Sequence, residues 1–227
     1  QNDRLGISQT DRLLILGSIE PKTNEVLLQP MQIMFNVDDT EPRIPGNYAI
    51  VLRNSNGDEL ARYPFTPDRI HFSPPVNPDE NDIELLSISE LVPYVTGTTQ
   101  VDIEALSEVL TSVRAGLATP SITLTTPNGG ETLNNDPITV SWTANDPDGD
   151  SLTFDVQYSH NNGNTWVQVA NNLTSTSVDI SAGNIASGNQ ALFRVVASDG
   201  IHTAIDESDA HFVVPNRMPS VTILTPE

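Results

Sequence analysis

The sequence contains no cysteine among its 227 residues. This absence excludes disulfide bonds, zinc–thiolate sites and a cysteine nucleophile. It does not exclude an extracellular protein, because many surface-exposed modules fold without disulfides. Long apolar runs are also missing, and none approaches the roughly 20 residues that a membrane-spanning helix needs. No signal-peptide pattern follows Gln1, as we expect for a fragment from the middle of a longer chain.

Basic residues are scarce, with 10 lysines and arginines against 30 aspartates and glutamates and a formal net charge of −20. Nucleic-acid binding is therefore disfavoured, because phosphate contacts need Lys and Arg. An anionic membrane surface is disfavoured for the same reason. The surplus of carboxylates offers many oxygen ligands to divalent cations. The simpler alternative is an acidic surface that is only solvated.

Aromatic residues make up only 5% of the chain. A sugar-binding platform would need several of them exposed and close together, and no such cluster is evident around Tyr63, Tyr94 or Tyr158. Trp142 lies among alternating apolar residues and is expected to anchor a core, and Trp166 is expected to fold against a sheet. Carbohydrate binding is therefore an alternative and not the main prediction.

A repeat is present near the end of the chain. The segment PSITLTTP at 120–127 returns as PSVTILTP at 219–226. The offset of 219 − 120 = 99 residues is about the length of one immunoglobulin-like sandwich. The second copy stops at Glu227, whereas the first continues into Asn-Gly-Gly-Glu at 128–131. We therefore expect a piece of a longer tandem array in which a third module has just begun.

Short strands separated by turn residues are expected throughout, with no long amphipathic helix. In the first module they are expected at 13–19, 25–28, 31–35, 48–52, 59–63, 83–88, 98–104 and 109–114, with a long excursion over 66–82. In the second module they are expected at 121–125, 138–143, 152–159, 166–170, 177–180, 191–198 and 210–214. A helix over 101–113 is the alternative, but Thr, Val and Ile alternate there with polar residues.

These patterns predict an all-β chain made of two tandem immunoglobulin-like Greek-key β-sandwiches. The predicted boundaries are 1–117 for a divergent first sandwich and 118–214 for the second, followed by 215–227 as linker and start of a further repeat. Residues 116–120 form the joint, and its shortness predicts limited freedom between the modules.

Six motifs of the second module occur in a characteristic order, namely Asn-Gly-Gly-Glu at 128–131, Ile-Thr-Val-Ser-Trp at 138–142, Asp-Pro-Asp-Gly-Asp at 146–150, Tyr-Ser at 158–159, Gly-Asn-Thr-Trp at 163–166 and Arg-Val-Val-Ala-Ser-Asp-Gly at 194–200. This module resembles the immunoglobulin-like, fibronectin type III-like and PKD-like repeats of secreted bacterial proteins, and the likeness covers 119–214. It implies an extracellular sandwich and no particular activity.

The first module is less similar to these repeats. Its motifs Gly-Ser-Ile at 17–19, Pro-Gly-Asn-Tyr at 45–48, Asn-Gly-Asp at 56–58 and Tyr-Pro-Phe at 63–65 resemble a divergent sandwich found before such repeats, downstream of secreted metallopeptidase domains. The resemblance implies an accessory role and brings no catalytic residue to this chain.

The turn Asp146-Pro-Asp-Gly-Asp150 is the best candidate for a bound ion. Calcium takes six to eight oxygen ligands, and alternate aspartates in a turn can direct several carboxylates at one point. Asp146, Asp148 and Asp150 are therefore predicted calcium ligands. The EF-hand pattern fails because position twelve is Gln157, so other loops must help. The candidate helpers are Asp199, Asp206 and Asp209. The alternative is a solvated turn shaped by Asp and Gly.

Other polar motifs have structural explanations. Ser159–Trp166 resembles an Asp-box turn with Asn161 in place of the aspartate, a motif in which a side-chain acceptor pins the amides of the turn. The histidines (His71, His160, His202 and His211) show no metal-ligand spacing and are expected in surface turns. The acidic pairs at 38–39 and 79–80 are expected to be solvated loop charges, and no nucleophile elbow occurs.

The chain is therefore expected to be non-enzymatic. Its modules would serve as spacer and interaction domains of a larger secreted or surface-attached bacterial protein, with calcium as the one possible cofactor. Expected partners are neighbouring domains of the same chain and a protein or glycan, without nucleic acid or membrane insertion. The alternatives are a substrate-docking region of a secreted metallopeptidase and a carbohydrate-binding module.

Overall fold

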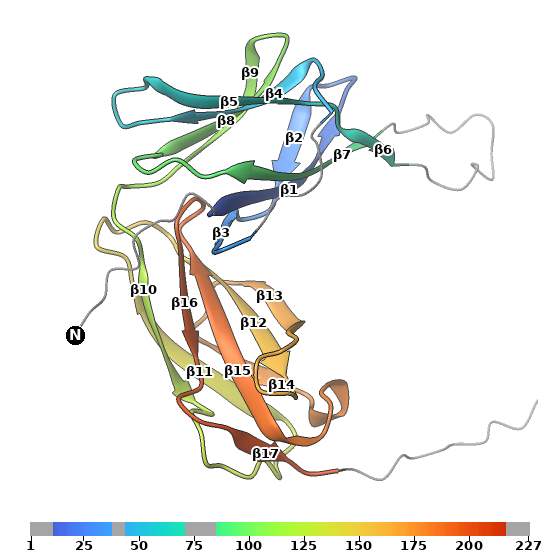
Figure 1. Cartoon of the computed structure of the whole chain (residues 1–227), viewed down its shortest axis with the longest axis vertical. Coiled ribbons are helices and arrows are strands. Elements are labelled where there is room, and N and C mark those ends of the chain that lie inside the picture. Colours follow the sequence, from blue (N-terminus) through green and yellow to red (C-terminus); the bar gives the residue numbers. More distant parts are fainter. Residues whose placement is uncertain (1–10, 38–43, 71–84, 217–227) are drawn as a thin grey trace, which may run out of the picture. The chain divides into compact units, whose positions relative to one another are not determined.

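The computed structural model describes residues 11–37, 44–70 and 85–216, which form β-strands throughout (Figure 1). Two compact units are present. The first contains Gln1–Pro120, Asp146–Thr153 and Ser198–Ala204, and the second contains Ser121–Asn145, Phe154–Ala197 and Ile205–Glu227. The second copy of the repeat, at 219–226, lies outside the described residues. In the described part of the chain no helix is long and apolar enough to cross a membrane.

The first sandwich consists of two sheets. One has the order β2-β1-β7-β6, with β3 also paired to β1, and the other has the order β5-β4-β8-β9. The strands are β1 (Arg12–Glu20), β2 (Glu25–Leu28), β3 (Gln32–Met34), β4 (Tyr48–Arg53), β5 (Glu59–Phe65), β6 (Asp68–Ile70), β7 (Leu85–Pro93), β8 (Gln100–Ala105) and β9 (Glu108–Arg114).

The second sandwich has one sheet of order β10-β11-β14 and one of order β13-β12-β15-β16, with β17 also paired to β15. Its elements are β10 (Ser121–Thr126), β11 (Ile138–Asn145), β12 (Thr153–Ser159), β13 (Val167–Leu173), β14 (Ser177–Ile180), the 3-10 turn η1 (Ala182–Asn184), β15 (Gly188–Ser198), β16 (Thr203–Glu207) and β17 (Phe212–Val214).

Both sandwiches contain a sheet in which two hairpins lie side by side. In the first, the β4–β5 hairpin is joined to the β8–β9 hairpin through β4 and β8, and in the second β12 and β15 make the equivalent junction. The intervening strands of each chain segment lie in the opposite sheet. This crossing between layers is the Greek-key feature of immunoglobulin-like sandwiches, and the predicted all-β sandwich fold is confirmed.

Most strand predictions agree with the structure, including the β8–β9 hairpin in place of a helix over 101–113. Two short strands were missed. β6 lies inside the predicted excursion over 66–82, and β16 lies in a segment with no strong run of β-branched residues. β6 has three residues and β16 has five. Such short strands are defined by their partner strand more than by local sequence.

The first core is aliphatic. Leu13 and Ile15 from one sheet and Ile50 and Leu52 from the other are fully buried in the same cluster. Each such side chain contributes about 1.5–3 kcal/mol on burial. Ile201, from the 198–204 segment of the first unit, belongs to the same cluster and is also fully buried. This segment is therefore part of the first unit by packing as well as by position.

The second core is aromatic. Trp142 is only 3% exposed and meets Phe154 at a ring separation of 5.4 Å. Phe193 stacks on Phe212 and lies 5.2 Å from each of Phe212 and Tyr158. The prediction that Trp142 anchors the core is confirmed. The turn at Gly129 packs closely on the segment before β17, because Gly129 has φ of 125° and a Cβ there would lie 2.6–2.7 Å from atoms of Ala210.

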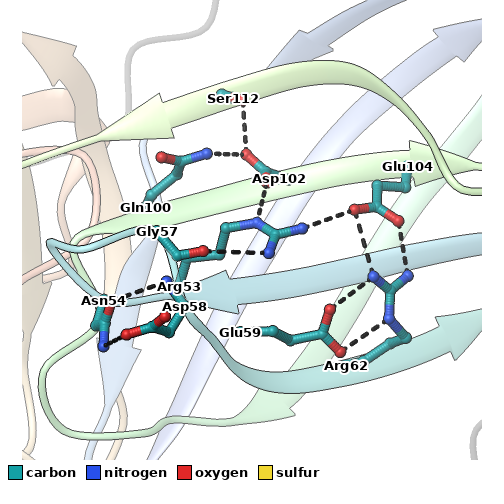
Figure 2. A network of polar contacts seen from close by, with 10 residues as sticks. All are labelled: Arg53, Asn54, Gly57, Asp58, Glu59, Arg62, Gln100, Asp102, Glu104 and Ser112. Atoms are coloured by element: carbon teal, nitrogen blue, oxygen red, sulfur yellow. Dashed lines mark hydrogen bonds and ion pairs between the residues drawn. The ribbon is translucent and has the colours of Figure 1, made fainter.

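An ionic network covers the outer face of the β5-β4-β8-β9 sheet, as Figure 2 shows. Arg53 binds Asp102 at 2.7 Å and Glu104 at 3.1 Å. Arg62 binds the other oxygen of Glu104 at 2.6 Å and Glu59 at 2.7 Å. The Asp102 and Glu104 side chains are only 1% and 4% exposed. The arginine stems therefore shield carboxylates that a two-layer fold would otherwise leave in water.

Hydrogen bonds keep Asp102 ionised. Desolvation alone would raise the pKa of Asp102, but hydrogen bonds from Ser112, Gln100 and Arg53 outweigh it and lower the pKa below its ordinary value. A carboxyl group whose pKa is lower in the folded state stabilises the fold above its unfolded pKa. This stability is lost as the pH falls through the folded pKa, below about 4.

We predict that Glu104→Gln lowers the free energy of unfolding by about 1–3 kcal/mol, because two partly exposed arginines lose a shared carboxylate. Glu59→Gln is the matched control and should cost at most about 1 kcal/mol, since that pair is exposed. Urea unfolding at pH 7 measures both.

We also predict that Asp102→Asn reduces the loss of unfolding free energy between pH 7 and pH 2, because the pKa of Asp102 is lowered in the folded state. Urea unfolding across this pH range measures the effect. An unchanged pH dependence would contradict the role given to Asp102.

The β8–β9 hairpin turns on two residues with positive φ. Leu106 has φ of 49° and Ser107 has φ of 73°, between Ala105 and Glu108, which pair with each other. Such turns prefer Asn-Gly, and a left-handed conformation costs other residues roughly 1–2 kcal/mol. Leu106 is 79% exposed, so little packing offsets this strain.

We predict that replacing Leu106 and Ser107 by Asn and Gly raises the free energy of unfolding by about 1–2 kcal/mol, because the strain of the turn is relieved. Leu106→Ala keeps the strained φ and should change stability by less than about 0.5 kcal/mol. Thermal and urea unfolding report both. Equal stability of the Asn-Gly variant and the native chain would show that the turn is not strained.

Candidate metal centre

The Asp-Pro-Asp-Gly-Asp turn directly follows β11. Asp146 Oδ1 accepts hydrogen bonds from the amides of Asp148 at 2.8 Å and Asp150 at 3.1 Å. Gly149 has φ of 82° and its amide donates to the Asp146 carbonyl at 3.2 Å. The first aspartate therefore closes the turn on itself, as Asx turns do, and only one of its carboxylate oxygens is used in doing so.

The other two aspartates of the turn bind the linker that precedes β10. The amide of Ala118 donates to Asp148 Oδ2 at 2.7 Å, and the amide of Gly116 donates to Asp150 Oδ2 at 2.5 Å. A Cβ at residue 116 would lie 2.1 Å from Asp148 Oδ2. Glycine at 116 therefore allows the linker backbone to approach the acidic turn.

A second turn, which follows β15, holds Asp199. Its Oδ1 accepts hydrogen bonds from the amides of Ile201 at 2.8 Å and His202 at 2.7 Å. Its Oδ2 lies 2.8 Å from His202 Nδ1, and the Asp199 side chain is completely buried. The carboxylate of Asp199 is therefore held in place by hydrogen bonds within its own turn.

His202 is held between two acceptors. Nδ1 faces Asp199 Oδ2, and Nε2 faces the Thr98 carbonyl at 3.1 Å. Burial alone would lower the pKa of His202, but the hydrogen bond and charge of Asp199, the Thr98 carbonyl and the charge of Asp146 outweigh burial and raise it. Both ring nitrogens can donate only in the protonated imidazolium, so the geometry and the raised pKa agree.

Three carboxylates converge at this place, from Asp146, Asp150 and Asp199. Each offers an oxygen, and these atoms all lie within 4.8 Å of one another. Calcium binds oxygen at 2.3–2.6 Å, so two ligands on opposite sides of the ion are separated by about 4.6–5.2 Å. The spacing is therefore compatible with one calcium ion among the three carboxylates.

One oxygen of this group is buried without a partner. Asp146 Oδ2 is shielded from solvent and accepts no hydrogen bond from any residue that the structure describes. A buried acceptor left unsatisfied costs about 1–3 kcal/mol. The Asp146 carboxylate also lies near two others of the same charge. A cation among the three oxygens would remove both penalties.

The remaining predicted ligands lie elsewhere. Asp148 is exposed and is not a member of the converging group. Asp206 Oδ2 accepts a hydrogen bond from the Leu124 amide at 2.7 Å, and Asp209 Oδ2 accepts one from Asn128 Nδ2 at 2.7 Å. Of the three helpers, only Asp199 is therefore brought to the turn, and the other two hold the start of the second sandwich.

The prediction that histidines occupy surface turns is wrong for His202, which is 3% exposed. His160 and His211 are exposed as predicted, and His71 lies outside the described residues. The acidic pairs at 38–39 and 79–80 also lie outside them. The hydrogen bonds from the amides of Gly116 and Ala118 to the acidic turn were not predicted from the sequence, because every residue except proline carries a backbone amide.

The Asp-box-like turn has the local chemistry that the sequence predicts. Asn161 Oδ1 accepts a hydrogen bond from the Thr165 amide at 3.0 Å. Trp166 is half-buried, and the Arg194 guanidinium lies 4.3 Å from the centroid of its ring. Arg194 also donates to Gln157 at 2.6 Å. Trp166 therefore packs on a side chain of β15 and forms no aromatic platform.

No protein-family model matches this chain, and no curated protein is significantly similar to it. The likeness to extracellular bacterial repeats therefore stays a prediction that rests on the sequence motifs.

We predict that His202→Phe lowers the free energy of unfolding by about 2–4 kcal/mol, because the Asp199 carboxylate and the Thr98 carbonyl each lose a buried donor. His160→Phe, at an exposed position, is the matched control and should change stability by less than about 0.5 kcal/mol. Urea unfolding at pH 7 measures the difference. Equal effects of the two substitutions would contradict the two-acceptor environment of His202.

Proposed function

We propose that this chain comprises two non-catalytic sandwich modules that act as spacer and interaction domains of a larger secreted or surface-attached bacterial protein. We further propose that a calcium ion bound by Asp146, Asp150 and Asp199 stiffens the linker. The observation that carries the ion is the buried, unpartnered Asp146 Oδ2 beside two further carboxylates. The tandem repeat and the likeness to extracellular modules support the spacer role.

Calcium suits the donor set better than other common metals. The three side chains offer oxygen only, which favours calcium, magnesium or manganese over zinc and copper. His202 lies close to the group, but hydrogen bonds occupy both of its ring nitrogens. Magnesium demands shorter bonds, near 2.1 Å, and regular octahedral geometry. Calcium tolerates the wider spacing of these oxygens, and protein carbonyls or water would complete its six to eight ligands.

An ion at this place would act on the linker through the acidic turn. Asp150 is both a member of the converging group and the acceptor for the Gly116 amide. Asp199 belongs to a turn that begins where β15 ends. Fixing these carboxylates would therefore fix the linker backbone and two turns that continue directly into strands of the second sandwich.

We predict that calcium raises the midpoint of thermal unfolding with an apparent dissociation constant of about 10⁻⁴–10⁻³ M, the range of extracellular modules. At a hundredfold excess over that constant, the stabilisation should approach about 2.7 kcal/mol. Asp146→Asn should abolish this response, because it removes the negative charge and puts a poorer ligand at the buried position. Isothermal titration with calcium provides the second measurement.

Three controls separate a bound ion from general screening of a chain with 20 excess negative charges. Asp148→Asn removes one charge from the same turn and should keep the calcium response. Sodium chloride at matched ionic strength should give a smaller rise, and magnesium should be weaker than calcium. A calcium response that survives Asp146→Asn, or that sodium chloride reproduces, would refute the site.

A further inference from the structure

The chain passes between the two units more often than a simple tandem requires. Within residues 85–216 it does so after positions 120, 145, 153, 197 and 204. Two domains joined only by a linker would give a single passage. The additional passages arise because two connections, Asp146–Thr153 and Ser198–Ala204, belong to the first unit, whereas most of each flanking strand belongs to the second.

The second of these connections, Ser198–Ala204, joins β15 to β16 and supplies a side chain to the first core. Ile201 is completely buried in the first core cluster. The other members of this cluster lie between residues 13 and 115. Gly200, with φ of 108°, lets the connection approach β9 closely, because a Cβ there would lie 3.2 Å from Val113 Cγ1. The first core is therefore closed by a residue of the β15–β16 connection.

The same connection provides hydrogen-bond partners for backbone groups at β3. The Ser198 hydroxyl donates to the Met31 carbonyl at 2.6 Å, and the Ile33 amide donates to Thr203 Oγ1 at 2.7 Å. All four residues are at most 4% exposed. A buried backbone group that loses its partner destabilises the fold unless water replaces that partner. The connection therefore holds β3 by polar contacts as well as by packing in the core.

A third contact joins the connection to the segment between β7 and β8. His202 Nε2 faces the Thr98 carbonyl at 3.1 Å, and its ring meets the Tyr94 ring edge-on at a centroid distance of 6.4 Å. Tyr94 and Thr98 are both buried. The connection thus contacts β3 from one sheet, β9 from the other and the segment that runs from β7 to β8. It bridges the two sheets of the first sandwich.

The shape of this connection depends on the strands that it joins. β15 and β16 are neighbours in one sheet of the second sandwich, and their pairing fixes the distance between the two ends of the connection. If that sheet unfolded, the connection would lose this constraint. The conformational entropy of a free segment would then oppose its docking against the first sandwich, and the place of Ile201 in the first core would be left unfilled.

We propose that the first sandwich folds only together with the second, because the β15–β16 connection completes its core, and that the two form one cooperative unit. The contacts that carry this proposal need no ion, so it is independent of the calcium site. Domains generally fold in order from the N-terminus during synthesis, whereas this first core is closed only after Ile201 has been made. For a spacer, such coupling means that neither module opens by itself.

Urea unfolding of the full chain, with a calcium chelator present throughout, tests this proposal with one probe for each sandwich. Both tryptophans of the chain, Trp142 and Trp166, belong to the second unit, so tryptophan emission reports on the second sandwich. Hydrogen exchange of β4 and β8, measured by mass spectrometry, reports on the first. We expect the same urea midpoint from both probes. Protection of β4 and β8 at a urea concentration where tryptophan emission is that of the unfolded chain would overturn the proposal.

Ile180→Ala confines the perturbation to the second sandwich. Ile180 is 4% exposed and pairs with Ile138 in β11. We expect this substitution to speed the exchange of β4 and β8 by about thirtyfold or more, because a lost isoleucine side chain destabilises the whole cooperative unit. Val167→Ala, at a position in β13 that is 60% exposed, is the matched control and should change this exchange by less than about threefold.

Ile201→Ala gives the converse test, because it removes a side chain from the first core. It should lower the urea midpoint of tryptophan emission as well as the protection of β4 and β8. If Ile180→Ala does not fold, Ile180→Val is the smaller change and should speed exchange about twofold to tenfold. An Ile180 variant that leaves β4 and β8 unchanged, or Ile201→Ala without effect on tryptophan emission, would refute the coupling. Asp146→Asn should keep the two midpoints equal, so the calcium proposal and this one fail separately.

Discussion

Acidic side chains outnumber basic ones threefold, 30 to 10, so most carboxylates have no basic side chain to pair with. Many of them accept hydrogen bonds from backbone amides instead. Glu131 accepts two amides in the Asn-Gly-Gly-Glu turn, and Asp206 accepts the amide of Leu124. Asp136 accepts the amide of Ala182, and Asp155 in β12 accepts the amide of Asn172 in β13. Each of these bonds between a carboxylate and an amide fixes a turn or links two strands. The acidic composition is therefore part of how the two sandwiches acquire defined connections and strand pairs.

In the described part of the chain, two groups of neighbouring carboxylates differ in the partners that they have. On the outer face of the first sandwich, Arg53 and Arg62 lie between Asp102 and Glu104 and keep a buried network nearly balanced in charge. At the acidic turn, His202 forms an ion pair with Asp199, whereas Asp146 Oδ2 has no donor among the described residues. The carboxylates of the first arrangement are paired with arginines, whereas the second leaves one buried carboxylate oxygen without a donor among the described residues.

Strand pairing gives the chain a different path through each sandwich although the two share a fold. In the first, β1 begins beside the end of β7 and β9 ends beside the start of β8, and the amide of Tyr94 after β7 donates to the Asp11 carbonyl before β1, so the chain returns to the end at which it began. In the second, β10 begins beside the end of β11, whereas β17 ends beside the start of β15.

The sequence alone determined the all-β class, most of the strands, the core position of Trp142 and the turn at 146–150, because alternation, turn residues and short-range hydrogen bonds act over a few neighbouring residues. It could not separate Asp199 from Asp206 and Asp209 as a helper, nor place the amide of Gly116 beside Asp150. Those pairings span tens of residues and depend on which strands pair and where each ends. Tertiary structure also decided the burial of His202 and the returning path of the first sandwich, since both arise from strand order and not from local composition.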